Sequence, residues 1–209
     1  MSKGNANAAM IEAIMGASGC GKTTRLVQRL NKRKRKRTVI WSPKEAQDKY
    51  ADLYPGTETV NTVADALRVM RAAGKGEFHL VFVPRLIRAQ DEKQFSALCK
   101  IVTALENITF IADELHTVTK PSWSPDGWGQ MVMMGRAYGI EIFGLSQRPS
   151  SVDKNFLGNL SSINVGRMAY EPDCKAVAPA LGVPWAEVSK LTGHQWIERH
   201  ILSGKITRG

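Results

Sequence analysis

One short stretch near the amino terminus constrains the fold of this chain more than any other feature. Residues 16–23 read Gly-Ala-Ser-Gly-Cys-Gly-Lys-Thr and fit the pattern G-x-x-x-x-G-K-[ST]. Such a stretch holds phosphates when a strand leads into it and a helix follows it, because backbone N–H groups and a helix N-terminus must converge on the anion. The apolar residues 11–15 precede it, and a helical pattern starts at Thr23. We therefore expect a strand–loop–helix unit of an α/β protein.

The residue types in this phosphate loop each have a physical role. The glycines allow backbone conformations and close approaches that a Cβ would block. Lys22 is expected to reach the β- and γ-phosphates, and the Thr23 hydroxyl to ligate Mg²⁺. Cys20 is interpreted as a small filler, because the pattern leaves its position free. We assign nucleotide binding to Gly16, Ala17, Ser18, Gly19, Cys20, Gly21, Lys22, Thr23 and Thr24.

Apolar, strand-like stretches alternate with helical patterns along the chain, which predicts a mostly parallel sheet flanked by helices. Strands are expected at 11–15, 38–41, 79–83, 108–112, 140–145 and 163–168, and helices at 23–30, 60–73, 89–106 and 127–138. After a short helix at 184–191, Ser203-Gly204 predicts a hairpin turn between 195–202 and 205–208. With 209 residues, we expect one domain over 1–209.

Two acids, Asp113 and Glu114, close the apolar stretch at 108–112. A parallel sheet presents its ligands at the carboxyl ends of its strands, so both acids are expected near the phosphate loop. Asp113 would hold Mg²⁺ through water, and Glu114 would act as general base on the attacking water. The alternative is a strand end with two surface carboxylates. A small-molecule kinase would not need the second acid, so Glu114 favours hydrolysis.

The charge of the chain is strongly positive. Lys and Arg number 29 against 19 Asp and Glu, which leaves a net charge of +10. This excess favours an anionic partner, most often nucleic acid, although a solvated basic surface that only keeps the protein soluble is equally consistent. The most basic run, Lys32–Arg37, would contact a DNA backbone, a capsid or lipid headgroups, or would be a solvated turn.

Other features exclude several classes of protein. The three cysteines and four histidines have no metal-binding spacing, so we interpret the cysteines as reduced thiols and the histidines as structural or surface residues. No apolar run approaches the ~20 residues of a membrane-spanning helix. The amino terminus lacks the apolar stretch of a signal peptide, so we expect an intracellular protein.

Residues 135–150 carry a further pattern: a helix ending in Gly-Arg, then Tyr-Gly-Ile, a strand, and Ser-Gln-Arg-Pro. Together with the phosphate loop and the two acids, this pattern resembles the FtsK–HerA superfamily of DNA-pumping ATPases over about residues 10–170. The short chain without a membrane anchor is most similar to the genome-packaging ATPases of tailless, internal-membrane (tectivirus-like) phages.

The resemblance implies a RecA-like P-loop NTPase fold and ATP-driven translocation of double-stranded DNA into a viral capsid, with ATP and Mg²⁺ as cofactors. It also implies a homo-oligomeric ring, pentamer or hexamer, with capsid vertex or membrane proteins as further partners. The protein would then act in the host cytoplasm or at the packaging vertex of the virion.

The resemblance further implies two catalytic roles. Gln147 would hydrogen-bond the γ-phosphate or the lytic water, although it could also be a polar strand terminus. The family usually has an arginine finger that reaches a neighbouring subunit's nucleotide. We assign it to Arg136, which could alternatively only meet a helix dipole; Arg148 and Arg167 compete for the role.

Three other functions remain open. A small P-loop kinase would want an acceptor pocket and lid arginines. A morphogenesis or secretion ATPase, like those of filamentous phages, would act on protein and membrane partners and usually carries a transmembrane helix. A nucleotide-gated binding switch with negligible turnover would tolerate loss of Glu114, which a motor would not.

Overall fold

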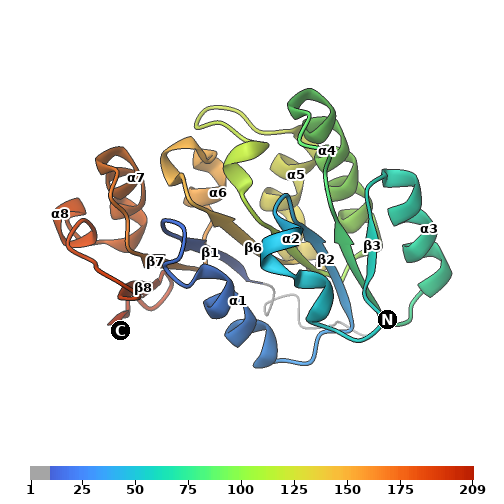
Figure 1. Ribbon diagram of the computed structural model, residues 1–209, viewed down its shortest axis with the longest axis horizontal. Coiled ribbons are helices and arrows are strands. Elements are labelled where there is room, and N and C mark those ends of the chain that lie inside the picture. The colour runs from blue at the N-terminus through green and yellow to red at the C-terminus, as the bar shows by residue number, and fades with distance from the viewer. Residues whose placement is uncertain (1–9) are drawn as a thin grey trace.

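The computed structural model describes residues 10–209 and contains a nine-stranded sheet in the order β3-β4-β2-β5-β6-β1-β7-β8-β9 (Figure 1). The strands from β3 to β7 in this order pair in parallel, and β8 and β9 continue the sheet antiparallel. The strands are β1 Ile11–Met15, β2 Arg37–Trp41, β3 Glu58–Val60, β4 Phe78–Phe82, β5 Thr109–Ala112, β6 Glu141–Ser146, β7 Ser162–Gly166, β8 Trp196–His200 and β9 Ile206–Arg208.

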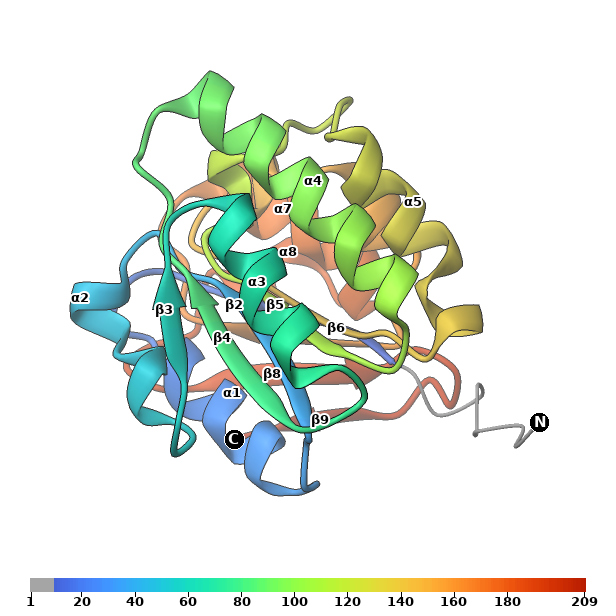
Figure 2. The same ribbon diagram turned by 90° about the vertical axis from the view of Figure 1, so that its right-hand side faces the viewer.

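Helices cover both faces of this sheet. They are α1 Lys22–Asn31, α2 Glu45–Asp48, α3 Val63–Ala73, α4 Arg88–Leu105, α5 Asp126–Met134, α6 Lys154–Gly158, α7 Glu171–Leu181 and α8 Trp185–Val188. Four short 3-10 turns are η2 Tyr50–Asp52, η3 Leu115–Thr117, η4 Gly135–Tyr138 and η5 Pro149–Ser151. Figure 2 shows α1 and α2 on one side of the strands, and α3, α4, α5 and α7 on the other.

The side chains of the parallel strands alternate between two cores because successive residues point to opposite faces. In β2, Val39 and Trp41 join the large core beneath α3 to α8, whereas Ile40 joins a smaller core with Leu26 and Leu30 of α1. Parallel strands covered by helices on both faces read as continuous apolar runs. This double burial is why the strands were visible in the sequence.

The predicted α/β fold is confirmed, including the mostly parallel sheet and the carboxy-terminal hairpin of β8 and β9. The differences lie in short or polar elements. Strand β3 was missed because two of its three residues are exposed. Helix α3 begins only at Val63, where the Thr62 hydroxyl accepts a hydrogen bond from the backbone N–H of Asp65 at 3.1 Å. Helix α7 was not expected either: it has 11 residues, but Pro172 and Pro179 break the helical pattern of its sequence.

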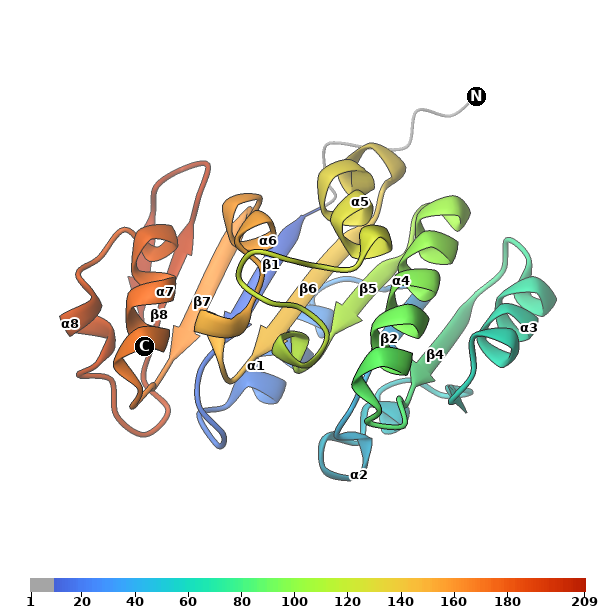
Figure 3. The ribbon, with the colours of Figure 1, turned by 90° about the horizontal axis from the view of Figure 1, so that it is seen from above.

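The parallel strands define two edges, which can be followed in Figure 3. The loops that leave the strands lie at the carboxyl edge, and the loops that enter them lie at the amino edge. Over residues 10–209, no helix combines the length and the apolar character needed to cross a membrane.

Candidate nucleotide-binding site

A pocket of about 340 Å³ opens at the carboxyl edge beside the phosphate loop. Strand β6 lies between β1 and β5, so its end places Gln147 between the phosphate loop and the two acids. The pocket is lined by the predicted residues Ser18, Gly19, Gly21, Lys22, Thr23, Thr24, Asp113, Glu114 and Gln147. Four further lining residues were not predicted: Lys44, Gln47, Asp48 and His194. The tertiary structure thus gathers most of the predicted site in one place.

The phosphate loop is held in an open shape by its glycines and by neighbouring backbone. Gly16 has φ +148°, and a Cβ there would lie 2.5 Å from the Cys20 sulphur. The N–H of Gly16 donates to the Ser146 carbonyl at 3.1 Å, and that of Ala17 to the Arg167 carbonyl at 2.9 Å. Because β6 and β7 anchor the loop in this way, it is formed before a ligand arrives.

Cys20 is fully buried beneath this loop. Its sulphur accepts a hydrogen bond from the guanidinium of Arg25, a buried residue of α1, at 3.5 Å. The side chain therefore fills space under the loop and does not line the pocket, as a filler would.

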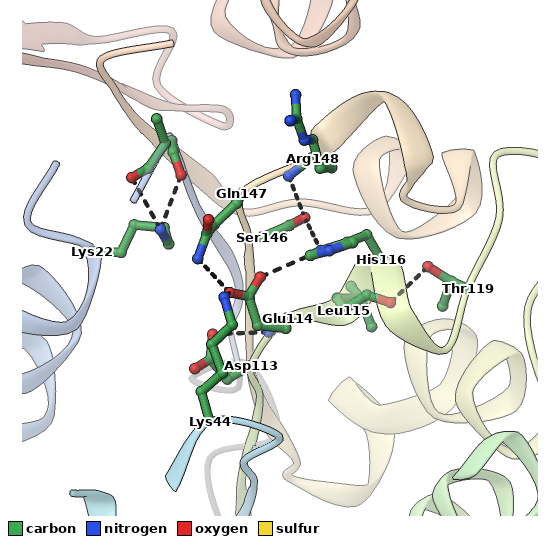
Figure 4. Close-up of polar contacts among 12 residues, drawn as sticks. Lys22, Lys44, Asp113, Glu114, Leu115, His116, Thr119, Ser146, Gln147 and Arg148 are labelled. Atoms are coloured by element: carbon green, nitrogen blue, oxygen red, sulfur yellow. Dashed lines mark hydrogen bonds and ion pairs between the residues drawn. The ribbon is translucent and has the colours of Figure 1, made fainter. Parts of the chain in front are cut away.

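Lys22 begins α1 and is 8% exposed. Its ammonium donates to the carbonyls of Gly16 at 2.9 Å and Ala17 at 3.2 Å (Figure 4). Both acceptors are neutral, so the positive charge remains available to a phosphate. The helix N-terminus adds a partial positive charge at the same point.

Thr23, Asp48 and Asp113 line the pocket with oxygen atoms suited to a divalent cation. The Thr23 hydroxyl donates to Asp48 Oδ1 at 3.2 Å, and the Tyr50 hydroxyl donates to Asp113 Oδ2 at 3.2 Å. Burial, and then the negative charges of Glu114 and Asp48, raise the pKa of Asp113 to about 7. A bound cation would relieve this crowding, and hydroxyl and carboxylate oxygens are the ligands that Mg²⁺ prefers. The donor set therefore fits magnesium.

Glu114 is held in an unusual conformation. Its φ of 48° is left-handed, which is strained for a residue with a Cβ and is a feature of functional sites. One carboxylate oxygen, Oε1, accepts hydrogen bonds from the Lys44 ammonium and the Gln147 amide. The other, Oε2, is buried and receives no hydrogen bond from residues 10–209, although the ring nitrogen Nδ1 of His116 lies 3.3 Å away. An acceptor oxygen without a donor is what a proton-accepting base requires.

His116 lies against this glutamate, contrary to the interpretation of all four histidines as structural or surface residues. Its Nδ1 is 3.3 Å from Glu114 Oε2 and 3.0 Å from the Ser146 hydroxyl. Burial lowers the pKa of His116, an effect that Glu114 partly offsets. His116 follows Glu114 by only two residues, and this proximity along the chain is the sequence signal for its place in the site.

The candidate arginines lie at different edges. Arg136 is in η4, which enters β6 at the amino edge, and its guanidinium donates to the Asn159 carbonyl at 2.6 Å. The structure therefore separates Arg136 from the other predicted catalytic residues of its own chain. The reason is topological: a segment that enters a parallel strand ends at the edge opposite the phosphates.

Arg148 and Arg167 follow β6 and β7 and lie at the carboxyl edge. The Arg167 guanidinium donates to the Ser18 carbonyl of the phosphate loop at 3.1 Å. Arg148 is more than half exposed, lies 3.3 Å from Asp173, and stacks over Tyr170.

The basic run Lys32–Arg37 divides into two kinds of side chain. Arg35 is buried and binds Glu141 through two hydrogen bonds of 2.7 and 2.8 Å. Arg37 donates to the carbonyls of Leu105 and Glu106 at 3.1 and 2.9 Å. The exposed members are Lys32, Arg33, Lys34 and Lys36. Arg35 and Arg37 are therefore not part of a solvated turn, because tertiary contacts immobilise both side chains.

Known proteins resemble this chain in sequence and in fold. No protein-family model matches the chain. Protein P9 of Pseudoalteromonas phage PM2 is 21% identical over 182 residues, which cover 85% of this chain and 78% of P9. The genome packaging NTPase B204 of Sulfolobus turreted icosahedral virus 2, in complex with AMPPCP, superposes with a TM-score of 0.70 at 12% identity over 96% of both chains.

A third similarity is to the N-terminal domain of zonular occludens toxin from Neisseria meningitidis. Its TM-score is 0.53 at 17% identity, over 96% of this chain and 93% of that one. The chain thus has the fold of nucleotide-binding P-loop proteins, and the resemblance to viral packaging ATPases predicted from the motifs is confirmed at the level of the fold.

Proposed function

We propose that this protein binds ATP with Mg²⁺ and hydrolyses it to drive double-stranded DNA into a viral capsid. One observation carries the enzymatic part of the proposal: a single pocket holds Lys22, the Thr23–Asp113 oxygen set, and Glu114 with Gln147. These are the cation, the metal site and the base–amide pair that phosphoryl transfer to water requires.

The phosphate loop would bind the triphosphate through its backbone N–H groups, while the Lys22 ammonium moves from the loop carbonyls to the β- and γ-oxygens. Thr23 and Asp113, with Asp48 beside them, would hold Mg²⁺, which neutralises charge on the phosphates. Glu114 then takes a proton from water as the water oxygen attacks the γ-phosphorus. The bond to the β–γ bridging oxygen breaks, and its electron pair leaves with ADP.

Gln147 is placed to orient that water, because its amide already contacts the Glu114 carboxylate. A kinase would instead need to exclude water and to admit a second substrate. A buried base with one oxygen that receives no hydrogen bond from residues 10–209 supports hydrolysis as the reaction.

The DNA-packaging part of the proposal is supported by two similarities and by charge. B204 is described as a genome packaging NTPase, and P9 is a phage protein. The net charge of +10 suits contacts with a phosphate backbone. We further propose that the chain acts as one domain, 1–209, in a homo-oligomeric ring of five or six subunits in the host cytoplasm or at the capsid vertex.

The decisive measurement is the ATPase rate with double-stranded DNA, with single-stranded DNA, and without nucleic acid. We expect double-stranded DNA to raise the rate most. Stimulation by membrane vesicles alone would instead support a morphogenesis or secretion ATPase. Nucleotide binding without turnover under all conditions would support a binding switch and would overturn the motor.

A further inference from the structure

Lys44 reaches the proposed catalytic base from a segment that the motifs do not include. It follows β2, enters the pocket from the side opposite Gln147, and places its ammonium on Glu114 Oε1 (Figure 4). The two side chains differ in exposure: Glu114 is 2% exposed and Lys44 is 41% exposed. The carboxylate is therefore fixed, whereas the ammonium lies at the open mouth of the pocket.

The same ammonium lies in the pocket that would receive the phosphates, together with Lys22, Thr23 and Asp113. A γ-phosphate brings more negative charge than a carboxylate, so it would compete for a nearby ammonium. Lysine suits an exchange of partners because it is a point charge on a flexible four-carbon stem, whereas the planar arginine fork favours a fixed bidentate contact.

We propose that Lys44 is a γ-phosphate sensor that holds Glu114 while the site is empty and exchanges it for a γ-phosphate oxygen when ATP binds. Loss of the Lys44 contact leaves Glu114 held by Gln147 at Oε1, with His116 beside Oε2, and it removes a positive charge that disfavours proton uptake by the carboxylate. ADP lacks the γ-phosphate, so with ADP the Lys44–Glu114 pair stays closed. Lys44 is thus a positioning residue for the base, and this role rests on the proposed function.

The exchange makes a thermodynamic prediction, because Glu114 and the γ-phosphate compete for one ammonium. Glu114→Gln should tighten binding of ATPγS by about tenfold, the scale of one charge-assisted hydrogen bond. In a Lys44→Met background the same substitution should change ATPγS affinity much less, since the competition has been removed. ADP affinity should stay within about twofold in all four proteins of this cycle.

Calorimetric titration of ATPγS and ADP into the full chain and these variants measures the cycle, with circular dichroism and thermal midpoints as a check on folding. Lys44→Arg should retain the preference for ATPγS over ADP, because the charge is kept. Lys49→Met is the matched control: Lys49 is exposed and does not line the pocket, so neither affinity should change.

Equal tightening by Glu114→Gln with and without Lys44 would overturn the sensor, because repulsion by the carboxylate would then account for the effect. Equal loss of ATPγS and ADP affinity in Lys44→Met would also overturn it. If the unmodified protein binds neither nucleotide, the proposed function itself fails, so the two failures are distinguishable.

Discussion

The two edges of the sheet both gather positive side chains but use them in opposite ways. At the amino edge, Arg35 and Arg37 donate to Glu141 and to the carbonyls that end α4, and neither arginine lines the nucleotide pocket. At the carboxyl edge, Lys22 donates to loop carbonyls, and Lys44, at the mouth of the pocket, contacts a buried carboxylate. A phosphate bound in the pocket can therefore replace the protein acceptors of Lys22 and Lys44, but not those of Arg35 and Arg37.

The difference follows from the direction of the helices. A helix ends with carbonyls that lack intrahelical donors and carry partial negative charge, and it begins with free N–H groups that carry partial positive charge. In this sheet, α1 and α4 end at the amino edge, and Arg35 and Arg37 donate to carbonyls of their last turns, those of Leu30 and Leu105. Helix α1 begins at the carboxyl edge, where it attracts an anion. The positive side chains near the start of α1 are therefore the ones placed to bind a phosphate.

The largest expected effect tests that distinction directly. Lys22→Ala should abolish ATP binding or turnover, because the phosphates lose their main cationic partner. Lys34→Ala, an exposed lysine of the amino edge, is the matched control and should leave the ATPase rate unchanged. The rates are measured with phosphate release on folded, purified variants. Retained activity in Lys22→Ala would contradict the central proposal.

The position of the arginine finger is the next test of the two edges. A finger in trans contributes ~10³ to 10⁵ in turnover. Mixing Lys22→Ala with a finger variant should restore some activity, since mixed rings contain a minority of intact interfaces. We therefore compare Arg136→Ala at the amino edge with Arg148→Ala and Arg167→Ala at the carboxyl edge.

Arg136→Ala will complement Lys22→Ala only if ring assembly brings the amino edge of one subunit to the nucleotide pocket of its neighbour. Complementation by Arg148→Ala or Arg167→Ala would instead place the finger at the carboxyl edge. A specific ATPase rate that does not fall on dilution would contradict a finger in trans altogether.

Glu114→Gln should lower turnover by ~10²-fold or more while ATP still binds, because the shape is kept and the base is lost. Stopped-flow or steady-state phosphate release gives the rate, and nucleotide titration gives the affinity. Normal hydrolysis by this variant would show that Glu114 is not the catalytic base and would leave Asp113 or Gln147 as the candidate for activating the water.

The crowded acids of the carboxyl edge predict a pH dependence. The pKa of Asp113 is raised to about 7 from its ordinary value of 3.8. Between these two values the folded state binds a proton that the unfolded state has lost, so the stability of the metal-free protein should fall as pH rises through this window.

Differential scanning calorimetry from pH 5 to 8 measures this dependence. Asp113→Asn should flatten it, and Mg²⁺ with nucleotide should stabilise the protein more at pH 8 than at pH 6. The contribution of Asp113 is the difference between the two proteins, because the lowered pKa of His116 makes stability rise with pH in the same window. A midpoint that changes with pH in the same way in the unmodified protein and in Asp113→Asn would contradict the raised pKa of Asp113.

The smallest expected effect concerns the basic run. Neutralising its exposed members, Lys32, Arg33, Lys34 and Lys36, should weaken DNA binding modestly and reduce the slope of log affinity against log salt. Arg35→Met should act differently, because the loss of the Glu141 contacts lowers the thermal midpoint whether or not DNA is present. An unchanged salt slope would identify the four side chains as solvated surface.

The sequence by itself determined the phosphate loop, the strands that frame it and the acids that close β5. These features depend on local patterns: glycine spacing, continuous apolar runs and a turn between strands. Strand order in a parallel sheet then obliges the ends of β1, β5 and β6 to meet, which is why Lys22, Asp113, Glu114 and Gln147 could be grouped before their positions were known.

Only the tertiary structure decided which charged side chains are held in contacts within the protein and which are available to a ligand. Arg35 pairs with Glu141 across 106 residues, and Lys44 with Glu114 across 70. Neither pairing leaves a trace in local sequence, because the energy of an ionic contact depends on the distance between atoms and on burial and not on spacing along the chain. Topology placed Arg136 at the amino edge, because η4 leads into β6 there, and the segment after β2 brought Lys44 and Asp48, absent from every motif, to the phosphate pocket.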